Sequence, residues 1–104
     1  GIPNSIIALD YNPGINEDSL MTLISYGYPN PCRDEIMFKI TGEGELYITM
    51  IDVLGRELVN KDLKISSESK IVTFKMGNYS SGIYFFIFRD LTYKNFVRKV
   101  CHLN

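Results

Sequence analysis

The sequence predicts an all-β fold, an immunoglobulin-like antiparallel β-sandwich of about seven strands in a single domain. Short apolar or alternating segments recur roughly every ten residues, between clusters of Gly, Pro, Asn, Asp and Ser. The aromatic residues are Tyr and Phe, which are typical of strands, and no segment shows a strong helical period. The chain has no Trp, so the Cys…Trp…Cys arrangement of antibody domains is absent and "immunoglobulin-like" describes the architecture alone.

The first part of the chain is rich in residues that interrupt regular structure. Pro, Gly and Asn are dense in residues 1–19, which predicts a linker or the tail of an upstream passenger. Residues 20–104 are expected to form the domain. Its first strand is expected over residues 20–28, and a short helical turn over residues 17–23 is the alternative.

The remaining strands follow from alternation and apolar runs. Ile36, Phe38 and Ile40 share one face of a segment whose other face is polar, as in a half-buried strand. The six further strands are expected at Glu35–Ile40, Glu45–Asp52, Arg56–Leu63, Lys70–Met76, Ile83–Arg89 and Tyr93–Cys101. The main connections are expected to be a turn at Thr41–Gly44, a polar loop at Ile65–Ser69 and a turn at Gly77–Gly82.

Two connections have a specific local cause. Asp52 and Gly55 bracket a reversal, because Asp bonds its own backbone in turns and Gly adopts a positive φ without steric cost. This predicts a β-hairpin in the middle of the chain. Pro29 and Pro31 fix φ and remove two backbone donors, so the segment between them belongs at a sheet edge and not inside a central strand.

The two cysteines, Cys32 and Cys101, are too few for a disulfide scaffold and wrongly spaced for a zinc site. The sequence favours two free, mostly buried thiols. The alternative is a single bridge between the start of the fold and its last strand, which needs Cα atoms roughly 4.4–6.8 Å apart.

Catalytic and metal-binding chemistry finds little support. His102 lies near the end of the chain, where fraying is expected, so a catalytic base there lacks rigid positioning. Glu43 and Glu45 are able to share a strand face and suggest calcium, but solvated turn carboxylates are favoured because calcium needs six or more oxygens. We therefore expect no enzyme, no metal and no cofactor.

Charge and hydropathy exclude two further classes. The formal net charge is −1 and the basic residues are scattered, whereas nucleic-acid binding needs a clustered basic face. No apolar run approaches the roughly 20 residues of a transmembrane helix.

Four segments occur in a fixed order: Tyr28–Pro31, Ile51–Leu58, Ser81–Phe85 and the basic strand Lys94–Val100. Together they resemble the C-terminal sorting domain of cargo proteins of the type IX secretion system, also called the Por secretion system, of Bacteroidetes. The resemblance covers residues 24–100. The family's motifs fall on Pro29, Asn30 and Pro31, on Asp52 and Gly55, on Gly82 and Tyr84, and on Lys94 and Lys99.

The resemblance implies a secretion address that directs an upstream passenger across the outer membrane to the cell surface or the medium. The implied partners are the outer-membrane type IX translocon and a sortase-like protease that removes the domain. The implied route passes through the periplasm. The final residues, Cys101 to Asn104, depart from the apolar-basic strand with which family members typically end.

Two other functions remain open from the residues alone. An immunoglobulin-like carbohydrate-binding or adhesion module would use exposed tyrosines, for which the candidates are Tyr26, Tyr47, Tyr79 and Tyr93. A structural spacer of a multidomain surface protein would need no partner. Taken singly, each motif residue also has a structural explanation: edge protection for the prolines, turn formation for Gly82, core packing for Tyr84 and solvation for the lysines.

Overall fold

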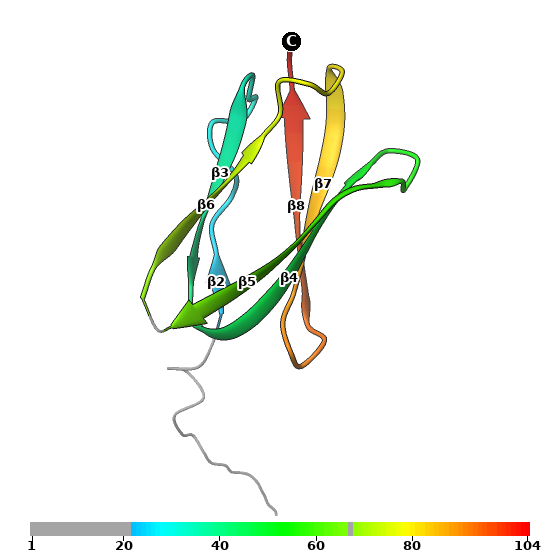
Figure 1. Ribbon diagram of the computed structural model, residues 1–104. Coiled ribbons are helices and arrows are strands. Elements are labelled where there is room, and N and C mark those ends of the chain that lie inside the picture. The colour runs from blue at the N-terminus through cyan, green and yellow to red at the C-terminus, as the bar shows by residue number, and fades with distance from the viewer. Residues whose placement is uncertain (1–21, 67) are drawn as a thin grey trace, which may run out of the picture.

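The computed structural model describes residues 22–66 and 68–104. They form two antiparallel sheets that pack face to face (Figure 1). The first sheet has the order β2-β3-β6, from β2 (Leu23–Ile24), β3 (Glu35–Thr41) and β6 (Lys70–Lys75). The second has the order β5-β4-β7-β8, from β4 (Glu43–Asp52), β5 (Glu57–Ser66), β7 (Gly82–Arg89) and β8 (Asn95–His102). The predicted all-β sandwich is confirmed.

The core lies between the sheets and is dominated by phenylalanine. Phe38 of β3 contacts Phe86 and Phe88 of β7, each with ring centroids 5.0 Å apart. Phe74 of β6 completes the cluster, 4.9 Å from Phe86. Such tilted or edge-on ring pairs stabilise a core beyond the area they bury. The expected inward face of Ile36, Phe38 and Ile40 is confirmed, since all three are fully buried.

The chain changes sheets at Gly42. The predicted turn at Thr41–Gly44 is wrong in extent, because β3 ends at Thr41 and β4 begins at Glu43. Gly44 lies inside β4 with a φ of +113°, opposite Ile65 of β5. Glycine makes this corner feasible because it has no Cβ to clash at positive φ. Alternation along the sequence does not show that neighbouring strands belong to different sheets.

Other boundaries also differ from expectation, and the last strand runs from Asn95 to His102 instead of from Tyr93 to Cys101. The polar loop predicted at Ile65–Ser69 is wrong at its start, because β5 continues to Ser66 and buries Ile65. The strand predicted over residues 20–28 is shorter where it is described, with β2 at Leu23–Ile24 and a separate bridge between Tyr28 and Met37. Leu23 is in a strand, not a helical turn. The predicted linker over residues 1–19, with Leu20 and Met21, lies outside the described residues.

Within the described residues, no helix is long and apolar enough to cross a membrane.

Candidate functional site

Asn30, between the two prolines, closes the free edge of β8. Its side-chain Nδ2 donates a hydrogen bond to the carbonyl oxygen of Lys99 at 3.2 Å. Its Oδ1 accepts one from the amide of Cys101 at 2.9 Å. The carboxamide therefore replaces one peptide unit of a neighbouring strand. Pro29 and Pro31 flank it, both after cis peptide bonds, and have no amide hydrogens of their own to pair.

The main chain continues this closure beyond the prolines. The amide of Cys32 donates to the carbonyl of Cys101 at 2.9 Å, and the amide of Leu103 donates to the carbonyl of Cys32 at 2.9 Å. These bonds form a parallel bridge between Cys32 and His102. Together with Asn30, they pair the backbone groups of β8 that face away from β7, from the carbonyl of Lys99 to the amide of Leu103.

Arg98, nearer the start of β8, joins this strand to the segment that contains Ile24 and Ser25. Its Nη2 donates to the carbonyl of Ile24 at 2.8 Å and its Nε to that of Ser25 at 3.2 Å. The guanidinium carbon lies 5.3 Å from the ring centre of Tyr26. Residues 25–32, which we call the edge strap, thus join the free edge of the four-stranded sheet to the smaller sheet, where Tyr28 bridges Met37.

His102 is fully buried, and the expectation of a frayed end is wrong. β8 runs through His102, which pairs with Gly82 of β7. Its Nε2 lies 3.0 Å from the carbonyl oxygen of Tyr79, and its Nδ1 lies 3.2 Å from that of Cys32. The ring therefore joins three segments of the chain at one point. Both ring nitrogens thus face backbone carbonyl oxygens in the interior, which are contacts of a structural kind.

The two thiols are free, as the sequence favoured. Cys32 is fully buried with its sulfur 3.9 Å from Nδ1 of His102, whereas Cys101 is half-buried. Their backbones are hydrogen-bonded, but Cys101 lies between the buried Val100 and His102, so it points to the opposite face of β8. Burial raises the pKa of the Cys32 thiol, which keeps it protonated and unreactive at neutral pH.

The reversal predicted at Asp52–Gly55 is present, and its carboxylate organises it. Oδ1 of Asp52 accepts hydrogen bonds from the amides of Leu54 at 2.9 Å and Arg56 at 3.0 Å. Oδ2 accepts from Nε of Arg56 at 2.7 Å. Gly55 has a φ of +81°. Burial alone raises the pKa of Asp52, but the hydrogen bonds, led by that from the Arg56 amide, outweigh it and lower the pKa.

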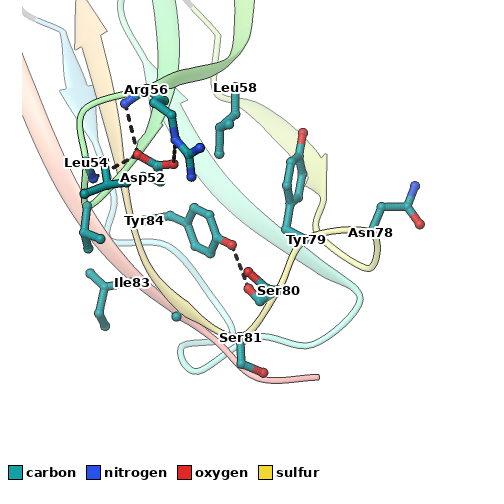
Figure 2. Close-up of a pocket in the computed structure, with 12 residues that line it drawn as sticks. Asp52, Leu54, Arg56, Leu58, Asn78, Tyr79, Ser80, Ser81, Ile83 and Tyr84 are labelled. Atoms are coloured by element: carbon teal, nitrogen blue, oxygen red, sulfur yellow. Dashed lines mark hydrogen bonds and ion pairs between the residues drawn. The ribbon is translucent and has the colours of Figure 1, made fainter.

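Tyr84 lies beside this turn, since it is the strand partner of Asp52. Its hydroxyl donates to the carbonyl of Ser80 at 2.6 Å, and its ring lies 5.9 Å from that of Tyr79. The turn and the segment 78–84 enclose a groove of about 300 Å³ (Figure 2). Asp52, Gly82 and Tyr84, from two separate motifs, all line it. We call this the turn groove.

A second turn repeats the geometry of the first at the opposite end of the sheet, between β7 and β8 (Figure 1). Oδ1 of Asp90 accepts from the amides of Thr92 at 2.9 Å and Lys94 at 3.0 Å. Tyr93, with a φ of 65°, occupies the position that Gly55 holds in the first turn. The Thr92 hydroxyl, at 2.7 Å, is the main cause of the lowered pKa of Asp90.

The two motif lysines lie apart from each other. Lys94 belongs to the second turn, where its ammonium group sits 5.1 Å from the ring centre of Phe96. Lys99 lies on the exposed face of β8, opposite Phe85 of β7. The structure therefore gathers the motif residues into an edge closure around Asn30 and a groove around Asp52, with Lys94 at the far end.

The carboxylate and tyrosine candidates have local contacts of their own. Among the described residues, no group of three or more His, Cys, Asp and Glu side chains is placed to hold a metal ion. Glu45 accepts a hydrogen bond from the hydroxyl of Tyr47, and its charge raises the pKa of that tyrosine. Tyr26 covers Arg98, and Tyr79 packs against Tyr84.

Arg56 and Arg98 are not among the nine predicted motif residues, but both make tertiary contacts that hold the site. A signal for Arg56 is its position four residues after Asp52, a spacing at which the backbone amide and guanidinium both reach the same carboxylate across a hairpin turn. Arg98 carries no comparable signal, because its partners lie more than 70 residues earlier in the chain.

The family model described as "Secretion system C-terminal sorting domain" matches residues 27–101. The match begins in the edge strap, ends in β8 and includes all nine motif residues. No curated protein matches the chain.

Proposed function

Because the chain belongs to the family of secretion system C-terminal sorting domains, we propose that its folded sandwich is the form that the outer-membrane type IX translocon recognises. The domain is a C-terminal sorting signal for type IX secretion. The family match supports this function over the carbohydrate-binding alternative. It also implies an upstream passenger that is exported to the cell surface or the medium.

The observation that carries the proposal is the edge closure of β8. A recognition module that presents a surface to a receptor needs that surface to be held in one arrangement. Asn30, Cys32 and Arg98 hold the last strand against the smaller sheet through hydrogen bonds of 2.8–3.2 Å. The bonds of Asn30 and Cys32 also occupy the outward-facing backbone groups of β8 from the carbonyl of Lys99 to the amide of Leu103, which removes them as sites for indiscriminate strand addition.

We further propose that the motif residues have two kinds of role. Pro29, Asn30, Pro31, Asp52, Gly55, Gly82 and Tyr84 shape the edge closure and the turn groove. Lys94 and Lys99 place positive charges on the surface, where a receptor can reach them. Residues 20–104 form the sorting unit, and residues 1–19 connect it to the passenger. A sortase-like protease cleaves within or near that connection, upstream of Tyr28, after the passenger has passed through the periplasm.

The test is export of a reporter. The complete 104-residue chain is fused to the carboxyl end of a periplasmic reporter in a Bacteroidetes host that has a functional type IX system. We expect the reporter at the cell surface or in the medium, and in the periplasm of a strain that lacks the translocon. Retention in the periplasm of the intact strain, while an established sorting domain exports the same reporter, would contradict the proposal.

A further inference from the structure

The turn groove combines an apolar wall with an unused cationic edge. Val53 and Leu54 at the tip of the turn are 67% and 74% exposed, and Leu58 and Ile83 contribute half-buried side chains to the lining. These apolar groups come from two segments that lie about 25 to 30 residues apart in the sequence. Exposed apolar side chains gathered around a groove are typical of an interaction surface.

Arg56 supplies the charge at the groove. Its Nε is held by Oδ2 of Asp52, which fixes the guanidinium beside Tyr84 (Figure 2). The side chain remains 70% exposed, and its two terminal amino groups have no hydrogen-bond partner among residues 22–66 and 68–104. The carboxylate of Asp52 already accepts three hydrogen bonds within its own turn, two from the amides of Leu54 and Arg56 and one from the Arg56 side chain. The remaining polar lining, Asn78, Ser80 and Ser81, is uncharged.

A comparable hollow at the opposite end of the sheet has the reverse character. It is lined by Glu43, Glu45 and Asp90, beside the exposed Leu91 of the second turn. That hollow is acidic and repels a carboxylate. The turn groove offers paired N–H donors of a guanidinium, the geometry that carboxylates match best.

We propose that the turn groove binds a segment of a translocon protein in which an Asp or Glu lies next to an apolar residue. The carboxylate pairs with the terminal amino groups of Arg56, and the apolar side chain packs on Leu54 and Ile83. This inference rests on the proposed function, because it identifies the surface through which the secretion machinery recognises the domain. The ion pair with Asp52 acts as the brace that orients Arg56.

Export of the reporter fusion tests the proposal in four variants of the complete chain. Arg56→Gln removes the charge, and Leu54→Ser removes apolar surface without removing a side-chain hydrogen bond. The matched controls are Arg89→Gln, an exposed arginine whose Nε also has a side-chain partner, and Leu91→Ser at the second turn. We expect both groove variants to reduce export by tenfold or more, and both controls to stay within twofold of wild type.

Folding and function are separated by one further measurement and by the export of the wild-type fusion. The melting curve of each purified chain is recorded. If the Arg56→Gln variant is unfolded, the export of the Leu54→Ser variant alone decides whether the turn groove is needed. Failure of the wild-type fusion to be exported contradicts the proposed function. Export of the wild type together with undiminished export of a folded Leu54→Ser variant overturns the groove and leaves the proposed function standing.

The chemistry of the partner is tested with two peptides. The amide signals of the complete chain are followed by NMR during titration with acetyl-Leu-Asp-Leu-amide and with its Asn counterpart. We expect saturable shifts at Leu54, Arg56 and Ser81 with the Asp peptide, and at least a fivefold weaker response with the Asn peptide. Equal responses to the two peptides, or shifts spread over the whole surface, would overturn the assignment of a carboxylate ligand.

Discussion

The two outer strands of the four-stranded sheet, β5 and β8, meet their surroundings in opposite ways. The free edge of β8 is closed by two hydrogen bonds with Asn30 and two with Cys32, and Arg98 of β8 donates two more to the carbonyls of Ile24 and Ser25. The outer edge of β5 pairs with no other strand among the described residues. The charged side chains of Lys61, Asp62 and Lys64 are exposed along this strand. One edge is blocked by tertiary contacts, and the other carries charged side chains that discourage pairing.

The difference shows how a small sandwich distributes its stability. β8 buries Val100 and His102, whereas the buried residue of β5 is Ile65 near its end. β8 is therefore held on one side by β7 and on the other by the edge strap, and β5 is held by β4 alone. We expect substitutions at the closed edge, along β8, to lower the free energy of unfolding far more than chemically similar substitutions at the open edge, along β5.

The largest expected effect is that of His102→Ala. The substitution removes a fully buried ring and leaves the carbonyl group of Tyr79 without its His102 partner, whereas the carbonyl of Cys32 keeps its bond from the Leu103 amide. We expect a loss of about 3 kcal/mol in the free energy of unfolding, measured by urea denaturation. Leu103→Ala, at a partly exposed neighbour, is the control. A change below about 0.5 kcal/mol for His102→Ala would mean that the end of β8 is not part of the cooperative fold.

Asn30→Ala is expected to rank next. It removes both side-chain hydrogen bonds to β8, and we expect a loss of about 1–2 kcal/mol together with faster hydrogen exchange of the Cys101 amide. Asn60→Ala is the matched variant at the open edge, where the carboxamide accepts from Thr49 on the exposed face. It should cost less than about 0.5 kcal/mol. Equal losses in the two variants would show that the edges do not differ.

Substitutions in the turns that lead into β5 and β8 are expected to change the free energy of unfolding by a smaller amount. The change should be an increase in one turn and a decrease in the other. Tyr93 holds a φ of 65°, a conformation that is unfavourable for a residue with a Cβ, whereas Gly55 holds the matching position in the first turn. We expect Tyr93→Gly to raise the free energy of unfolding by about 1 kcal/mol and Gly55→Ala to lower it by a similar amount. Thermal unfolding measures both, and a destabilised Tyr93→Gly variant would indicate that the tyrosine ring makes compensating contacts.

The smallest expected effect is the dependence of stability on acid. The pKa values of Asp52 and Asp90 are lowered in the folded protein, so each contribution is complete above the unfolded value of about 3.9 and disappears as the pH falls through the folded value. Stability should therefore decline more steeply below about pH 4 in the wild type than in the double variant Asp52→Asn with Asp90→Asn. Parallel curves in urea denaturation at several pH values would contradict this.

Much of the fold follows from local pattern. Alternation identified the inward face of β3, and Asp52 with Gly55 identified the reversal between β4 and β5. Local pattern reports which side of a strand is apolar, but it does not report the sheet to which the strand belongs. The crossing at Gly42 and the extension of β5 to Ser66 were missed for this reason.

The candidate site was predictable in part. The motifs indicated Asn30, Asp52 and Tyr84, but their partners are set by contacts between distant segments. Asn30 lies 69 residues before Lys99, and His102 lies 70 residues after Cys32. No spacing rule along the chain predicts such contacts, and a terminal histidine is expected to fray unless its partners are known.

The parallel bridge between Cys32 and His102 has a consequence for the order in which the molecule is completed. The edge strap belongs to an early part of the domain and bonds β3 through Tyr28 and Met37, but its bonds to β8 cannot form until residues 98–103 are present. Contacts of this sequence separation form slowly, because the long intervening loop must first be ordered. A chain that emerges from a ribosome or a membrane pore with its amino end first therefore forms the contacts between the edge strap and β8 last. A truncated chain that ends before β8 cannot form them.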